Sequence, residues 1–198
     1  MRKNSSQRGA AAIEFTLSTM FLVPLLLGTL VFGFRLIRRI EMDQITRDLG
    51  HMYVQGVDFT NAGPVQNAQT LASGFDLTAM GSSDVLLSKI KTIQQSDCDA
   101  ANPTHPGVQC TNYNKQVFME QLTIGNSSAG SSRFGTPPMT GNTVSITDQA
   151  NNPAAVAANF MNVPAGVIAY MAEMNNQTPD LNIPGFSGMP LVYSSAIF

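Results

Sequence analysis

The sequence predicts an α+β fold, in which a long N-terminal transmembrane helix continues into a small antiparallel-sheet domain. Two observations carry this prediction. Residues 15–34 form a run of twenty uncharged, mostly apolar residues close to the N-terminus. Strand-like segments follow from about residue 85, separated by stretches rich in Gly, Pro, Asn and Ser. A chain of 198 residues has room for about one domain beyond such an anchor.

The uncharged run has the length of a membrane span. As an α-helix at about 1.5 Å per residue, residues 15–34 extend roughly 30 Å, the thickness of the hydrocarbon core of a bilayer. The run exceeds the roughly 7–15 apolar residues of an ordinary secretory signal. The alternative is a core helix of a soluble domain, which rarely has such a run so near a terminus.

The orientation of the span is not decided by charge, because three basic residues lie on each side of it: Arg2, Lys3 and Arg8 before it, and Arg35, Arg38 and Arg39 after it. The nine residues on the N-terminal side are too few to fold. The part of the chain on the C-terminal side of the span contains Cys98 and Cys110, which suit a disulfide in an oxidising compartment. We therefore expect the N-terminus in the cytoplasm and the C-terminal domain outside, in the periplasm or at the cell surface. Two free thiols are the alternative.

The helix is expected to continue beyond the membrane. Apolar residues recur there at steps of three and four, which is a helical pattern: Leu36, Ile37, Ile40, Ile45, Leu49 and Met52. One helix over residues 10–55 would be roughly 70 Å long and would carry the domain on this apolar stripe. Two helices broken near Arg38 are the alternative.

A disulfide-tied hairpin is predicted in the middle of the chain. Residues 85–94 and 115–124 both have strand-like patterns, and a loop with a cysteine near each end connects them. A bond between Cys98 and Cys110 would close a loop of about a dozen residues and stabilise the fold by roughly 3 kcal/mol in the chain-entropy model.

The other elements are short. We expect a helix over residues 65–74, a strand over 143–147 and one or two helical turns over 153–161, where Pro153 suits a helix start. Residues 166–175 fit a strand by their β-branched and aromatic content, or a helix by their Ala and Met content. We favour a strand, because Gly and Pro bracket the segment, and we expect a closing strand over residues 191–198.

Composition argues against several classes of function. From residue 40 onward the chain has five Lys/Arg against twelve Asp/Glu, which excludes a basic nucleic-acid surface. No catalytic motif of a serine hydrolase, a P-loop enzyme or a zinc protease is present. We therefore expect no enzyme, no catalytic residue and no cofactor.

No metal site is expected either. His51 and His105 have no acidic residue or cysteine at a metal-ligand spacing, and the cysteines do not form a CxxC pair. The weak alternative is a calcium cluster of Asp97, Asp99 and Asn102, whose spacing is not that of an EF-hand loop.

The junction before the apolar run has a distinctive order of residues: Arg8-Gly9-Ala10-Ala11-Ala12-Ile13-Glu14-Phe15. A cut after Gly9 would make Ala10 the new N-terminus and Glu14 its fifth residue. The free amine would then lie one helical turn from a carboxylate at the membrane surface. Because a charge near the hydrocarbon region is costly, Glu14 is expected to have a charged partner.

That pattern resembles the class III leader of type IV pilin-like proteins, and most of all the TadE-like pseudopilins of Tad (Flp) pilus systems. The resemblance is specific over residues 8–34, and beyond them only the order of elements agrees. It implies that a membrane-embedded prepilin peptidase cleaves between Gly9 and Ala10. It also implies that Glu14, with Phe15 beside it, serves assembly by neutralising the terminal amine of a neighbouring subunit.

The resulting hypothesis is a minor pilin or pseudopilin that takes part in Tad-pilus assembly. It divides the chain into a basic leader (1–9), a transmembrane helix (10–38) and an exported α+β domain (39–198). The implied partners are membrane lipid, the prepilin peptidase, other pilins or pseudopilins and the pilus assembly platform, with no nucleic acid. The alternative is an uncleaved, single-span binding or adhesion module outside the cytoplasm. A membrane-tethered enzyme is a third and weaker alternative.

Overall fold

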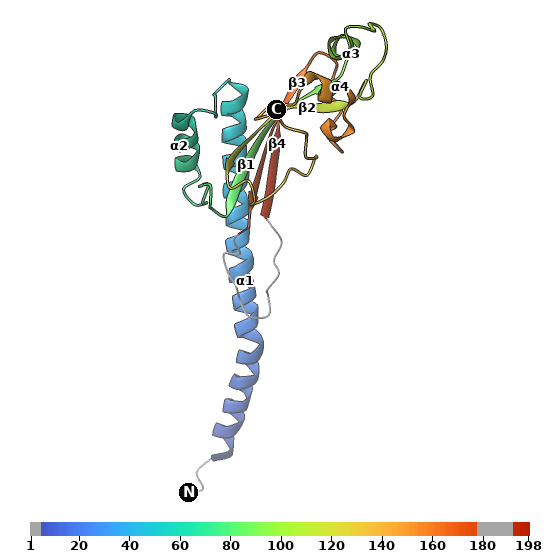
Figure 1. Cartoon of the computed structure of the whole chain (residues 1–198). Coiled ribbons are helices and arrows are strands. Elements are labelled where there is room, and N and C mark those ends of the chain that lie inside the picture. The colour runs from blue at the N-terminus through green and yellow to red at the C-terminus, as the bar shows by residue number, and fades with distance from the viewer. Residues whose placement is uncertain (1–4, 178–191) are drawn as a thin grey trace.

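A computed structural model describes residues 5–177 and 192–198 of the chain. Four α-helices, one 3₁₀ turn and four strands are described (Figure 1). The elements run in the order α1 (Ser5–Val54), α2 (Ala62–Leu71), β1 (Ser83–Thr92), α3 (Gln95–Ala101), β2 (Gln116–Gly125), α4 (Ile146–Asn151), the 3₁₀ turn η1 (Pro153–Ala155), β3 (Ile168–Asn176) and β4 (Val192–Ile197).

Helix α1 is continuous over 50 residues and has Pro24 in its interior. At 1.5 Å per residue it is about 75 Å long. The prediction of one helix is confirmed, and the alternative of a break near Arg38 is wrong. Figure 1 shows that the N-terminal half of α1 stands clear of the other elements, while α2 and the sheet lie beside its C-terminal half.

The four strands form one antiparallel sheet in the order β2-β1-β3-β4. Val85 in β1 lies opposite Ile124 in β2 and Met174 in β3, so β1 and β3 form the centre of the sheet. Together with α1, this arrangement confirms the α+β fold. The predicted β1–β2 hairpin is correct, and so is the choice of a strand rather than a helix for the segment that forms β3.

The main core lies between α1 and one face of the sheet. Met42, Ile45, Leu49 and Tyr53 of α1 pack with apolar residues from α2 and all four strands. The predicted apolar stripe is therefore only partly correct, because its first members are about half exposed: Leu36, Ile37 and Ile40. Steps of three and four residues occur on core-facing and lipid-facing surfaces alike, so the pattern alone could not locate where the domain begins.

A second, smaller core lies on the sheet face that points away from α1. Ile90, Phe118 and Met171 come from β1, β2 and β3, and they pack with Cys98 and with Ala155 of η1. This core lies under α3 and α4, which Figure 1 places at the end of the sheet farthest from the N-terminus. The disulfide therefore belongs to the part of the domain most distant from the apolar half of α1.

Two short elements differ from the sequence-based expectation. The connection between β1 and β2 contains helix α3, which begins with a capping box between Gln94 and Asp97. The strand expected over residues 143–147 is wrong. Thr143 forms only isolated bridges, and the Ser145 side chain caps α4 by accepting a hydrogen bond from the Asp148 backbone N–H at 3.1 Å.

The remaining short elements are close to their predicted places. Helix α2 begins and ends three residues earlier than expected, and the helical turns expected over residues 153–161 reduce to η1. The closing strand is confirmed as β4, although the first residue of its predicted range, Leu191, lies outside the described residues.

Candidate assembly helix and leader junction

The N-terminal half of α1 is apolar, and most of its large side chains are exposed. In the described residues, it is the one helix long and apolar enough to cross a membrane, with a mean hydropathy of 2.1 and 6% of its apolar window buried. A core helix of a soluble domain would be mostly buried instead. The exposed large side chains of this surface are Ile13, Phe15, Leu17, Met20, Phe21, Leu22, Val23, Leu25, Leu26, Leu27, Leu30, Phe32, Phe34, Leu36, Ile37 and Ile40.

The leader junction lies within the helical backbone of α1. Gly9 and Ala10 are helical, so Glu14 follows Ala10 by one turn of the same helix. The side chains of Glu14 and Phe15 are exposed, and Phe15 is 75% exposed. Within the described part of the chain, no hydrogen bond or ion pair of Glu14 is formed. The carboxylate and the ring are therefore available to groups outside this chain.

The hydroxyl groups of the apolar half bond to its own backbone. Thr16 Oγ1 donates to the Ala12 carbonyl at 2.8 Å, and Thr19 Oγ1 donates to the Phe15 carbonyl at 2.7 Å. Such local bonds satisfy hydroxyl groups where no water is present. The polar residues inside the run therefore do not oppose burial in lipid or against other helices.

Arg38, one of the three arginines that follow the apolar run, makes contacts within the domain. The guanidinium of Arg38 donates to the Gly74 carbonyl at 2.8 Å, lies 3.4 Å from the Glu41 carboxylate and stacks over Phe75, 5.2 Å from its centroid. Arg38 thus joins α1 to the connection between α2 and β1. From the sequence, Arg38 is a membrane-flanking charge, and no spacing rule links it to Gly74.

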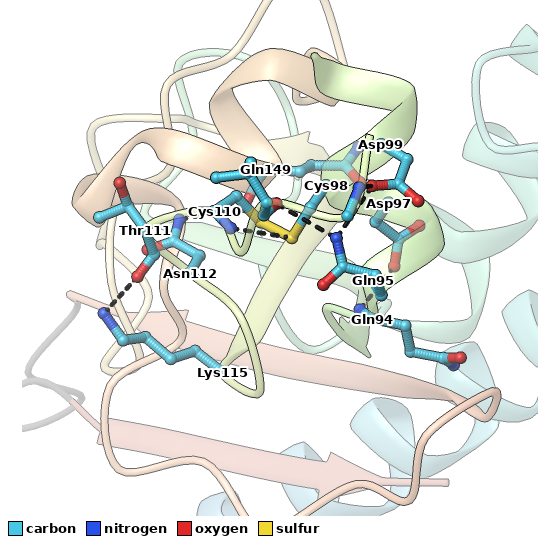
Figure 2. The surroundings of a disulfide bond; sticks show 12 residues. Gln94, Gln95, Asp97, Cys98, Asp99, Cys110, Thr111, Asn112, Lys115 and Gln149 are labelled. Atoms are coloured by element: carbon cyan, nitrogen blue, oxygen red, sulfur yellow. Dashed lines mark hydrogen bonds between the residues drawn. A yellow bond between two sulfur atoms is a disulfide. The ribbon is translucent and has the colours of Figure 1, made fainter. Parts of the chain in front are cut away.

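The predicted disulfide is present. Cys98 in α3 bonds to Cys110, with their Cα atoms 5.2 Å apart, and Figure 2 shows the bond enclosed by the surrounding turns. The Cys110 N–H donates to Cys98 Sγ at 3.2 Å. The adjacent Asn112 side chain donates to the Gln149 and Asn152 carbonyls at 3.0 and 2.7 Å, which ties this loop to α4 and η1. The alternative of two free thiols is wrong.

The acidic residues beside the disulfide are already engaged. Asp97 pairs with Lys91 at 2.7 Å and accepts from the Gln94 N–H at 2.9 Å. Asp99 accepts from the Gln95 amide and the Gly107 N–H, and these hydrogen bonds lower its pKa. No group of three or more His, Cys, Asp or Glu side chains that could hold a metal occurs within residues 5–177 and 192–198.

Comparison with known proteins agrees with the N-terminal reading. Residues 9–50 match the family model described as TadE-like protein. No curated protein matches the chain, and no solved structure matches it. The match begins at Gly9 and ends near the C-terminus of α1, so it covers Glu14, Phe15 and the exposed apolar half. Over residues 9–50 the chain is therefore similar to TadE-like proteins, and the similarity is limited to helix α1.

Proposed function

We propose that this chain is a minor pilin or pseudopilin that takes part in assembly of a Tad-type pilus. A prepilin peptidase cleaves after Gly9, and the helix that then begins at Ala10 packs laterally with helices of other pilins. The domain built on the C-terminal half of α1 is held outside the cytoplasm. The family match over residues 9–50 supports an association with Tad pili and a structural rather than a catalytic protein.

The main support for this proposal is that the family match and the exposed apolar surface lie on the same helix. The matched segment begins at Gly9, and the surface that needs a cover follows within the same helix. Leaving large apolar side chains in water costs roughly 25 cal/mol per Å² of accessible area. Lipid would bury this surface before assembly, and neighbouring pilin helices would bury it afterwards.

The second candidate is an uncleaved anchor that holds a binding or adhesion module outside the cytoplasm. The exposed apolar helix and the disulfide fit this function as well. The two candidates differ in the N-terminus of the mature protein, which is Ala10 after peptidase cleavage and remains Met1 in a plain anchor.

The test is the intact mass and N-terminal sequence of the full chain, isolated from the membranes of cells that contain the pilus system. We expect a mature N-terminus at Ala10. Gly9→Val should block cleavage, because glycine lets a protease groove close around the backbone and valine adds a branched side chain there. Gly28→Val is the matched control, since no atom lies within 4 Å of a Cβ placed at Gly28, and it should be processed normally.

Two results would contradict the proposal. A parent chain that keeps Met1 in the presence of an active peptidase would favour the plain anchor. Cleavage of Gly9→Val at the rate of the parent would show that the peptidase does not recognise this junction.

A further inference from the structure

A buried acidic group lies on the sheet face opposite α1, outside the assembly surface. Asp84 in β1 is directly opposite Asn175 in β3, and Glu173 lies two residues before Asn175 on the same strand. Because side chains alternate along a strand, these three share one face, while their neighbours Val85 and Met174 pack toward α1. All three residues of the group have 0% exposure.

Most side-chain oxygens of this group have no hydrogen-bond partner of ordinary geometry among the described residues. Both carboxylate oxygens of Asp84, Oε2 of Glu173 and both amide atoms of Asn175 are buried without a hydrogen bond of ordinary geometry. Buried polar atoms are almost always paired, because an unpaired one costs about 1–3 kcal/mol, and more if it is charged. Four buried oxygens without such a partner, on three residues of one sheet face, point to a ligand from outside the chain.

The surrounding side chains do not supply the missing positive charge. Glu173 Oε1 accepts from the Tyr193 hydroxyl at 2.6 Å and from the Arg133 backbone N–H at 3.1 Å, which leaves Oε2 unpaired. The Arg133 guanidinium stacks over the Tyr193 ring at 3.9 Å, and no ion pair joins it to Glu173 or Asp84 within the described residues. Two carboxyl groups are thus buried on one face without an ion pair to a described side chain.

A loop segment covers the buried acidic group on the side away from the sheet. Residues 126–133 cross this face of the sheet, and Gly130 lies so close to Asn175 that a Cβ at Gly130 would overlap the amide. Ala129 of this segment is 1% exposed. The Gln177 side chain holds the segment by donating to the Ser128 and Ala129 carbonyls at 2.9 and 2.6 Å. The side-chain oxygens of Asp84, Glu173 and Asn175 are therefore screened from bulk water.

We propose that Asp84, Glu173 and Asn175 form a calcium site between the sheet and residues 126–133. Carboxylate and amide oxygens are the hard ligands that calcium prefers, and two carboxylates balance one divalent charge. Calcium is favoured over magnesium, because calcium accepts bidentate carboxylates and irregular coordination, whereas magnesium demands a near-ideal octahedron. The unpaired oxygens of Asp84 suit a bidentate contact, with Glu173 Oε2 and Asn175 Oδ1 as further ligands.

The buried position of the group also changes the pKa of two side chains, Asp84 and the neighbouring Tyr193. Burial, together with the nearby Glu173 carboxylate, raises the pKa of Asp84 to about 6, while the Asn175 amide acts in the opposite direction. Burial also raises the pKa of Tyr193, and its hydrogen bond to Glu173 adds to this effect. Burial is the largest cause of both shifts, and the Glu173 carboxylate adds to each of them.

The test uses the full chain in detergent, freed of metal with EDTA and then titrated with calcium chloride. We expect calorimetry to find one calcium ion per chain, and millimolar calcium to raise the thermal unfolding midpoint by several degrees. Asp84→Asn should reduce the affinity for calcium about tenfold or more, and it should fold without metal because it removes a buried charge. Asp58→Asn, at an exposed carboxylate in a turn, is the matched control and should keep the calcium response.

A spectroscopic measurement on the parent chain makes the test independent of the variants. Terbium(III) takes calcium sites and emits when a nearby tyrosine is excited, and Tyr193 touches Glu173. We expect terbium emission that added calcium abolishes. The proposal is overturned if the unfolding midpoint is the same in calcium and in EDTA, or if Asp84→Asn responds like the parent. A midpoint that ignores calcium but rises on acidification would show that a shared proton, and not a cation, stabilises the pair.

Discussion

Glu14 carries a charge at the edge of an apolar surface, with no partner in the described part of its own chain. An exposed carboxylate in water needs none. Covering the surrounding helix with lipid or with other helices removes that water, and an unpaired charge then becomes costly. The proposed cleavage creates a suitable partner, because a free α-amine has a pKa of about 7.7–8.0 and is mainly protonated at neutral pH.

Replacing Glu14 with Gln should therefore weaken assembly and leave processing intact. The change keeps the size of the side chain and removes its charge, and cleavage depends on Gly9. A charge-assisted hydrogen bond is worth about 1.5–3 kcal/mol, so recovery of partner pilins with the purified chain should fall about tenfold or more. Glu14→Val should have the same effect, whereas Glu41→Gln, outside the apolar run on the same helix, should not. Undiminished recovery of partners with a correctly cleaved Glu14→Val chain would refute the docking role.

At the scale of the element, the disulfide stabilises one end of the domain. It joins α3 to the loop that follows it, and Asn112 continues the connection to α4 through the Ala150 carbonyl, at 2.8 Å from the Asn112 backbone nitrogen. Phe118 and Met171 of the second core lie beneath these elements. The main core against α1 has no residue from α3, so loss of the disulfide should affect the two ends of the domain unequally.

The double variant Cys98→Ser, Cys110→Ser should lose about 3 kcal/mol of unfolding free energy in the chain-entropy model. Amide hydrogen exchange should accelerate most in α3 and in residues 102–112, and least in the centre of β3. Reduction of the parent chain should reproduce the pattern, which separates the loss of the bond from the effect of serine. Uniform acceleration across the sheet would contradict a local role.

The sequence predicted the long elements and missed the short ones, for a physical reason. The β1–β2 hairpin and its disulfide are evident from two periodic segments and the cysteines between them. Helix α4 is set by a single capping contact of Ser145, and six residues are too few to show a period. The Asp84–Glu173–Asn175 group is formed by the pairing of β1 with β3, and no local pattern could join residues so far apart in the chain.

At the scale of the whole molecule, α1 has two halves with different surroundings. Leu49 is fully buried in the main core, whereas Leu22 is 60% exposed on the apolar half. Leu49→Ala should lower the unfolding free energy of the domain by about 2–5 kcal/mol, because it removes buried methyl groups and leaves a cavity. Leu22→Ala, the same chemical change, should leave domain unfolding in detergent unaltered. Circular dichroism measures both, and equal destabilisation would show that the halves are not independent.

Because α1 is one continuous helix, its apolar half is connected directly to the half that packs in the domain. The helix is continuous from Ser5 to Val54, with Pro24 in its interior, so the orientation of the domain is coupled to the position of the apolar half. Successive residues of an α-helix are rotated by about 100° around its axis and advance by about 1.5 Å along it. A small rotation of the apolar half about the helix axis would therefore move the sheet around that axis. A force applied to the domain would be transmitted along the helix to the apolar half.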